Sequence, residues 1–241
     1  MKFVNKEHYD LIKEMLGAFE VHFDNSLELI SPKEIIVSLM SRVERDGVTK
    51  LLDFLDKHGF YEAPASTRFH GNFPGGLAEH SINVCALLYR ENKANNGGLS
   101  DESIIISALM HDLCKVDFYV KEIKNVKTYL TDENRAKYKG YGIKHEEVNG
   151  EPRDFCWVPT EGYSIEDQMP LPHGSKSLYI LQSFIKVTRE EAFLITWHMG
   201  PYGNLADNTY GFNNAVEYQH SVALMYVADF LASALYEIKA E

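Results

Sequence analysis

The feature that most constrains the fold of this chain is an apolar segment that ends in two polar residues. Residues 104–110 are Ile-Ile-Ile-Ser-Ala-Leu-Met, and His111 and Asp112 follow directly. An apolar run of this kind predicts a helix that is buried in the interior. Burying an imidazole and a carboxylate beside it costs free energy unless something pairs with them. The fold must therefore bring a partner to both side chains, and a divalent cation is the natural one.

The composition is that of a globular protein. The chain has 241 residues, of which 45% are apolar, and this is enough for a substantial core. No apolar stretch approaches the roughly 20 residues of a membrane span, and the N-terminus lacks the apolar region of a signal peptide. We therefore expect a cytoplasmic protein with no membrane partner. The net charge of −11 disfavours long nucleic acid as a partner but permits a small phosphorylated substrate held through bound cations.

The three cysteines, Cys85, Cys114 and Cys156, give no sign of a disulfide framework. They are widely spaced, odd in number and form no CxxC pair. Cys85 and Cys114 fall in apolar stretches predicted to be helical. We therefore interpret these two as small core residues.

Hydrophobic periodicity and capping signals predict a mostly helical chain. We expect helices over about 7–19, 31–47, 49–57, 75–95, 100–111, 175–185, 188–200 and 214–239. Ser31 with Glu34 and Thr188 with Glu191 form capping boxes at two of these helix starts. Residues 117–168 alternate only weakly and contain many Tyr and Gly residues, which predicts a small β-hairpin or irregular insertion. The fold class that follows is all-α, a helical bundle that carries this insertion.

Other histidines and one other aspartate lie in settings like that of His111 and Asp112. Two histidines lie in predicted apolar helices, one lies at a helix entrance, and the aspartate lies deep in an apolar run: these are His80, His198, His173 and Asp229. Buried imidazoles and carboxylates that converge are best explained by a shared metal ion. Nitrogen and oxygen ligands without a thiolate spacing disfavour a structural zinc site. They suit one or two ions of Mn, Fe, Ni, Co, catalytic Zn or Mg, and the sequence does not select among these.

The order of these residues along the chain resembles a known enzyme family. The order His80, then His111-Asp112, then Asp229 is similar to that of the HD superfamily of metal-dependent phosphohydrolases. The segment Gly-Gly-Leu-Ala-Glu-His over residues 75–80 and the Ala-Asp pair at the end of the pattern strengthen the resemblance. The resemblance implies that these four residues hold one divalent metal ion.

The resemblance covers residues 69–234 and implies an HD-type helical domain. We expect a single domain over 1–241, with an N-terminal helical extension over 1–60, a core over 61–238 and the insertion over 117–168. His173 and His198 lie where two-metal members of the family place additional histidines. They are expected to support a second metal ion or to line a phosphate pocket.

The activity that the resemblance implies is hydrolysis of a phosphate ester by a metal-activated water molecule. Asp112 would bind one ion or bridge two while it positions the water. Lys115 follows Asp112 by three residues, so a helix would place it on the same face, and we expect it to contact phosphate. Arg68, His70 and Lys176 are further candidates for binding the substrate phosphate, and His70 or Arg68 could also protonate a leaving group.

The substrate class stays open among phosphate esters of nucleotides and related small molecules. Monoesterase, triphosphohydrolase and phosphodiesterase activities are all compatible with the motif. One alternative is a 3′-to-5′ exonuclease acting on short oligonucleotides, because residues 69–80 resemble the HD region of bacterial 3′-to-5′ exoribonucleases. Another is a metal-binding sensor without catalysis that uses residues 117–168 as a partner surface. A homo-oligomer is compatible with either activity.

Overall fold

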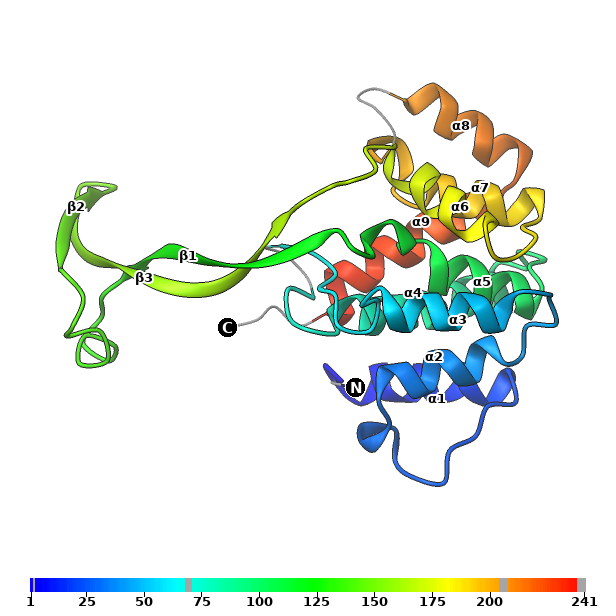
Figure 1. Cartoon of the computed structure of the whole chain (residues 1–241), viewed down its shortest axis with the longest axis horizontal. Helices are drawn as coiled ribbons and strands as arrows, with labels where there is room; N and C mark the ends of the chain where they lie inside the picture. The colour runs from blue at the N-terminus through cyan, green and yellow to red at the C-terminus, as the bar shows by residue number, and fades with distance from the viewer. Residues whose placement is uncertain (2, 68–70, 204–207, 238–241) are drawn as a thin grey trace. The chain divides into compact units, whose positions relative to one another are not determined.

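The computed structural model describes residues 1, 3–67, 71–203 and 208–237 (Figure 1). Contacts divide the chain into two compact units, and the larger contains residues 1–119 and 167–241. The smaller contains residues 120–166. Among the described residues, no helix is both long and apolar enough to cross a membrane.

The larger unit is built from helices. Its α-helices are α1 Lys6–Ala18, α2 Pro32–Met40, α3 Val48–Lys57, α4 Gly76–Ala94, α5 Asp101–Met110, α6 His173–Gln182, α7 Arg189–Trp197, α8 Thr209–Tyr218 and α9 Ser221–Leu231. Short 3-10 turns are η1 Leu27–Leu29, η2 Leu113–Lys115 and η3 Gly200–Tyr202, and η4 Ala232–Tyr236 is a π-helix.

Two of these helices, α4 and α5, lie at the centre of the hydrophobic core. Helix α4 packs against α1, α2, α5 and α9, and α5 also packs against α7. Residues 104–110 of α5 are all buried, which confirms the burial predicted from the sequence. A helix that is apolar on every side is stable only when other elements surround it. The residues that follow α5 are therefore delivered into the interior of the unit.

Helix starts agree with the sequence more closely than helix ends. Both capping boxes form, at Ser31 and at Thr188. Helix α2, however, ends at Met40 instead of continuing to residue 47. The chain leaves the helix there, and Arg45 reaches the Glu102 and Glu191 carboxylates, both at distances under 3 Å. A tertiary ion-pair network thus holds the segment that follows the helix.

The predicted helix over 214–239 is also divided. Helix α8 begins at Thr209, ahead of the predicted start at residue 214, and ends before Gln219, whose backbone is extended. Helix α9 follows, and then the π-helix η4. The Gln219 side chain donates to the Glu190 carboxylate and to the Ser221 hydroxyl. These bonds join the break to α7, and no Gly or Pro in the sequence marks it.

The smaller unit overturns the all-α prediction. It is a three-stranded antiparallel sheet in the order β1-β3-β2, formed by β1 Tyr119–Tyr129, β2 Lys144–Val148 and β3 Glu151–Ile165. Strands β2 and β3 pair through an Asn149-Gly150 turn in which both residues have positive φ, as a two-residue hairpin requires. Strands of 11 and 15 residues exceed a small hairpin, so the chain mixes α and β structure. The single-domain prediction stays a prediction.

The Arg45 network generates a test of stability. Glu191 is fully buried and accepts from both guanidinium ends of Arg45 at 2.7 Å. Replacing Arg45 by Met leaves this carboxylate without its cation, and we expect the free energy of unfolding in urea to fall by roughly 3 kcal/mol. Arg42→Met is the matched control, because Arg42 pairs with Glu20 at the surface and exposed pairs contribute at most about 1 kcal/mol. Equal losses in the two variants would contradict the structural role of Arg45.

Candidate metal centre

The structure brings the six residues predicted as metal ligands into one buried cluster. They come from five helices: His80 lies in α4, His111 and Asp112 follow α5, His173 begins α6, His198 follows α7, and Asp229 lies in α9. Among the described residues, three overlapping groups have ligand atoms within 4.8 Å of one another, and these six residues with Cys114 make them up. The convergence expected from the sequence is therefore present in the fold.

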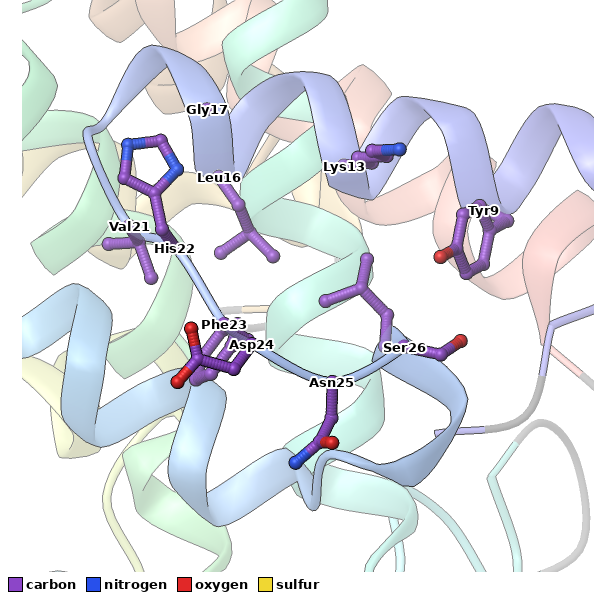
Figure 2. A pocket seen from close by; sticks show the side chains of 11 residues that line it. Tyr9, Lys13, Leu16, Gly17, Val21, His22, Phe23, Asp24, Asn25 and Ser26 are labelled. Atoms are coloured by element: carbon purple, nitrogen blue, oxygen red, sulfur yellow. The ribbon is translucent and has the colours of Figure 1, made fainter.

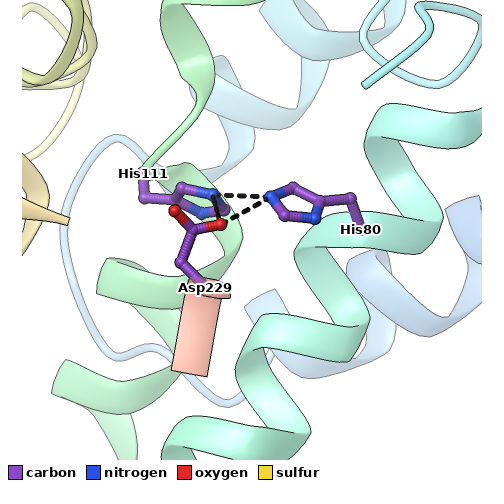
Figure 3. A group of neighbouring side chains, drawn as sticks. All are labelled: His80, His111 and Asp229. Carbon is purple, nitrogen blue, oxygen red and sulfur yellow. Dashed lines mark hydrogen bonds and ion pairs between the residues drawn. The ribbon is translucent and has the colours of Figure 1, made fainter. Parts of the chain in front are cut away.

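One side of the cluster consists of His80, His111, Asp229 and one oxygen of Asp112. His80 Nε2 lies 3.1 Å from His111 Nε2 and 3.1 Å from Asp229 Oδ1 (Figure 3). Asp112 Oδ2 lies 3.5 Å from His80 Nε2 and 3.4 Å from His111 Nε2. Metal bonds of about 2.0–2.2 Å place neighbouring ligand atoms roughly 3.0–3.5 Å apart. We call these four ligand atoms the first subsite, and their spacing suits one divalent ion.

The other side of the cluster faces the second oxygen of the same carboxylate. Asp112 Oδ1 lies 2.7 Å from His173 Nε2 and 3.6 Å from His198 Nε2. His198 Nε2 is a buried atom with no hydrogen-bond partner among the described residues. A buried nitrogen left in this state points to a missing ligand. We call Asp112 Oδ1, His173 and His198 the second subsite.

Two of the histidines are oriented by the ends of the helices that they follow. His111 Nδ1 lies 2.7 Å from the carbonyl oxygen of Ala108, and His198 Nδ1 lies 2.7 Å from that of Ile195. The final carbonyls of a helix lack intrahelical donors, so each ring donates its Nδ1–H there. That tautomer leaves the Nε2 lone pair free, and in both residues Nε2 faces Asp112.

His80 is oriented by a carboxylate that the sequence analysis missed. Its Nδ1 bonds Glu237, whose side chain is 4% exposed. Glu237 follows the π-helix η4, and π-helical turns are frequent at functional sites. A carboxylate behind a ligating histidine makes the imidazole a stronger base and fixes its direction. Its place in the charged, polar C-terminal segment gave no signal of this role.

The pKa values of several histidines and aspartates in the cluster are shifted strongly from their ordinary values. Burial lowers the pKa of His80, but Glu237 and Asp229 outweigh burial and raise it to about 10. Burial likewise lowers the pKa of His173, while Cys114 and Asp112 raise it to about 9. Burial favours the neutral acid form of Asp112 and of Asp229, yet the neighbouring cations hold both pKa values below the ordinary range. Protons on the histidines thus balance the carboxylates when no metal ion is bound.

The lysines predicted to bind substrate occupy different surroundings. Lys115 Nζ lies 2.6 Å from Asp112 Oδ2 and 2.6 Å from the carbonyl oxygen of Ala65, and its side chain is 11% exposed. A 3-10 turn, not an α-helix, places it there. Lys176 is buried and pairs with Asp167 at 2.5 Å, so its charge is already balanced. Arg68 and His70 lie outside the described residues.

Close packing at a glycine positions the second subsite. A Cβ atom added to Gly174 would lie 2.4 Å from the carbonyl oxygen of Thr196 and 2.5 Å from that of Ile195. Any larger residue would therefore push the start of α6 away from the end of α7. This contact sets His173, the first residue of α6, beside His198, with ring centroids 5.2 Å apart.

A separate pocket of about 410 Å³ lies between α1 and residues 21–27 (Figure 2). Its α1 side is lined by Tyr9, Lys13 and Leu16 together with Gly17. None of the predicted ligands lines it. It therefore has no part in the candidate metal centre.

No family model, no curated protein and no solved structure matches this chain. Buried nitrogen and oxygen atoms lie at ligand spacing, and one imidazole nitrogen has no hydrogen-bond partner within the described part of the chain. These residues fit a divalent metal ion whose identity stays open.

The bond between Glu237 and His80 predicts a change in metal affinity. Replacing Glu237 by Gln keeps a hydrogen-bond acceptor for His80 Nδ1 but removes the negative charge. We expect the dissociation constant for Zn²⁺, measured by competition with a chromophoric chelator, to rise by about 10- to 100-fold. Glu14→Gln is the control, because Glu14 pairs with Lys93 on the exposed surface. An unchanged dissociation constant in Glu237→Gln would remove Glu237 from the site.

The raised pKa of His80 predicts an alkaline loss of stability in the metal-free protein. Its pKa is about 10 in the fold against an ordinary value of 6.5. A raised pKa contributes stability that is complete below the unfolded value and is lost as the pH rises through the folded value. The melting temperature of chelator-treated protein should therefore fall between pH 7 and pH 10. The melting temperatures of the metal-loaded protein and of metal-free His80→Asn should fall less over the same pH range. Parallel profiles of melting temperature against pH for all three samples would refute this account.

Proposed function

We propose that this protein is a metal-dependent phosphohydrolase that acts on a phosphate ester of a nucleotide or a related small molecule. The observation that carries the proposal is the buried Asp112 carboxylate, whose oxygens face two different sets of histidines. A carboxylate in this position can bridge two ions, and paired ions roughly 3.5–4 Å apart suit phosphoryl chemistry. The order of the ligands along the chain, which resembles that of the HD superfamily, supports the same activity.

The surrounding residues suit this chemistry. Bound divalent ions supply hydroxide as a nucleophile near neutral pH and neutralise the oxygens of the phosphoryl group. Lys115 keeps Asp112 ionised and holds its Oδ2 in place. The His80 and His111 side chains are at most 1% exposed, so bulk water is excluded from that side. The His173 side chain is 28% exposed and marks the side from which a substrate would enter.

A hydrolysis panel tests the proposal. Protein purified without chelator is first analysed for its metal content. It is then incubated with Mn²⁺, Mg²⁺, Ni²⁺ or Zn²⁺ and with mononucleotides, nucleoside triphosphates, cyclic nucleotides and a labelled oligonucleotide. Metal-dependent release of phosphate from a small ester is the expected result. Degradation of the oligonucleotide alone would favour the exonuclease alternative, and retained metal without any turnover would favour the sensor.

Asp112 is the residue whose replacement should affect hydrolysis most. Asp112→Asn keeps the shape of the side chain but removes the charge shared by the two subsites. We expect the hydrolysis rate to fall at least about 100-fold and the bound metal to fall in parallel, with the melting transition still cooperative. Asp117→Asn is the matched control, because Asp117 is exposed and pairs with His58 at the surface. Wild-type hydrolysis by Asp112→Asn would overturn the assigned site.

A further inference from the structure

A sulfur atom lies beside the second subsite, in a residue that the sequence suggests is a core residue. Cys114 Sγ is 3.3 Å from Nδ1 and 3.6 Å from Nε2 of His173. Ligand atoms of Asp112, Cys114 and His173 lie within 4.8 Å of one another. Cys85 belongs to the contiguous hydrophobic core, whereas Cys114 does not, although both are buried. The environment of Cys114 is therefore the polar cluster.

A hydrogen bond to His173 does not account for the place of this thiol. The two ring nitrogens of an imidazole point in different directions, so a donor on the lone-pair axis of one nitrogen lies far from the other. The nearly equal distances of 3.3 and 3.6 Å put the sulfur beside the ring instead. Hydrogen bonds weaken steeply away from the axis. The contact with His173 therefore leaves the lone pairs of the sulfur available to bind a cation.

The backbone around Cys114 is fixed to the helix that carries His173. The Cys114 N–H donates to the Ser177 hydroxyl at 3.0 Å, and Ser177 is fully buried one turn along α6 from His173. Gly174 holds the start of α6 against the end of α7, as described above. The segments that carry Cys114, His173 and His198 are therefore locked to one another. The thiol is presented to the second subsite by the framework of the fold.

We propose that Cys114 is a thiolate ligand of a cation in the second subsite, together with Asp112 Oδ1, His173 and His198. This inference rests on the metal centre of the proposed function and adds the identity of one ligand. Zinc bonds of about 2.0–2.1 Å to nitrogen and 2.3 Å to sulfur give a nitrogen–sulfur edge of roughly 3.5 Å. The 3.6 Å between Sγ and His173 Nε2 is close to that edge, but the 3.3 Å to Nδ1 places Sγ beside the ring. Sγ therefore reaches a cation on the Nε2 axis after the Cys114 side chain turns about its Cα–Cβ bond. The unpartnered His198 Nε2 supplies independent support for an ion at this place.

The ligand set determines which ions the second subsite prefers. On binding, the sulfur donates a lone pair to the cation, and the thiol proton passes to solvent. Thiolate favours Zn²⁺ and Co²⁺ over Mg²⁺ and Mn²⁺, whereas the first subsite offers only nitrogen and oxygen. The ion in the second subsite should therefore be bound more selectively than the ion in the first.

Titration of the metal-free full chain with Co²⁺ tests the proposal. Thiolate-bound Co²⁺ absorbs intensely in the near ultraviolet by charge transfer from sulfur, and Co²⁺ bound only by nitrogen and oxygen does not. Wild-type protein should bind two equivalents and gain this band with one of them. Cys114→Ser should lose the band and one equivalent but keep the weaker visible bands of Co²⁺ in the first subsite. Cys156→Ser, which changes a buried cysteine of the smaller unit, should keep the band.

Two outcomes would overturn the proposal. The first is Co²⁺ binding by wild-type protein without the charge-transfer band, and the second is a Cys114→Ser variant that keeps it. Circular dichroism of both serine variants shows whether each is folded, and alkylation by iodoacetamide gives a second readout. Metal should slow the labelling of Cys114 that is measured in the metal-free folded protein, and a measurable labelling rate of this thiol that is equal with and without Co²⁺ would contradict ligation. None of these measurements depends on turnover, so a failed hydrolysis panel leaves this inference standing.

Discussion

The arrangement of the larger unit depends on one buried carboxylate. Asp112 is 2% exposed and lies within 3.6 Å of four imidazole nitrogens and the Lys115 ammonium. A charge buried this deeply is tolerated only when cations or strong donors surround it. Side chains from α4, α5, α6 and α7 or their ends point at this carboxylate. Segments far apart in the sequence therefore offset the cost of burying its charge.

Helix ends do much of the positioning in this cluster. Helices α5 and α7 both end at a histidine that uses Nδ1 to satisfy a backbone carbonyl and leaves Nε2 for the site. One bond thus caps the helix and selects the tautomer. A backbone group also positions Cys114, because its N–H donates to Ser177 and so fixes η2 to α6. The site is therefore held by backbone groups of rigid elements and needs few dedicated supporting side chains.

The sequence predicted the cluster because its members are costly to bury, and it failed where the cause was tertiary. His80, His111 and Asp229 stand out as polar residues inside apolar helical runs. Glu237 does not stand out, because it lies in a charged segment and its side chain is buried beside His80 only in the folded chain. The segment after the early end of α2 and the break at Gln219 likewise make contacts with Glu191 and Glu190 that no local pattern contains.

The length of the strands was underestimated because their sequences carry little local signal. Strand β1 shows only weak alternation, and several of its apolar side chains remain exposed, including Ile123 at 72%. Period-two patterns are strong only where one face of a sheet is buried. The Asn149-Gly150 pair is a local signal of a β-hairpin that our prediction did not use, since positive φ at both positions favours these two residues. It marks one hairpin and gives no information on the length of the strands.

The two subsites differ in a way that suggests a division of labour. The first is almost fully buried and is backed by Glu237, which strengthens His80 as a base. The second includes His173, whose side chain is 28% exposed, and has Cys114 beside it. Thiolate donation lowers the positive charge of a cation, so an ion held by Cys114 would activate water less than one held by nitrogen and oxygen alone. In the proposed hydrolysis, an ion in the first subsite would be the one suited to generating the nucleophile, and an ion in the more open second subsite would be suited to receiving the phosphate.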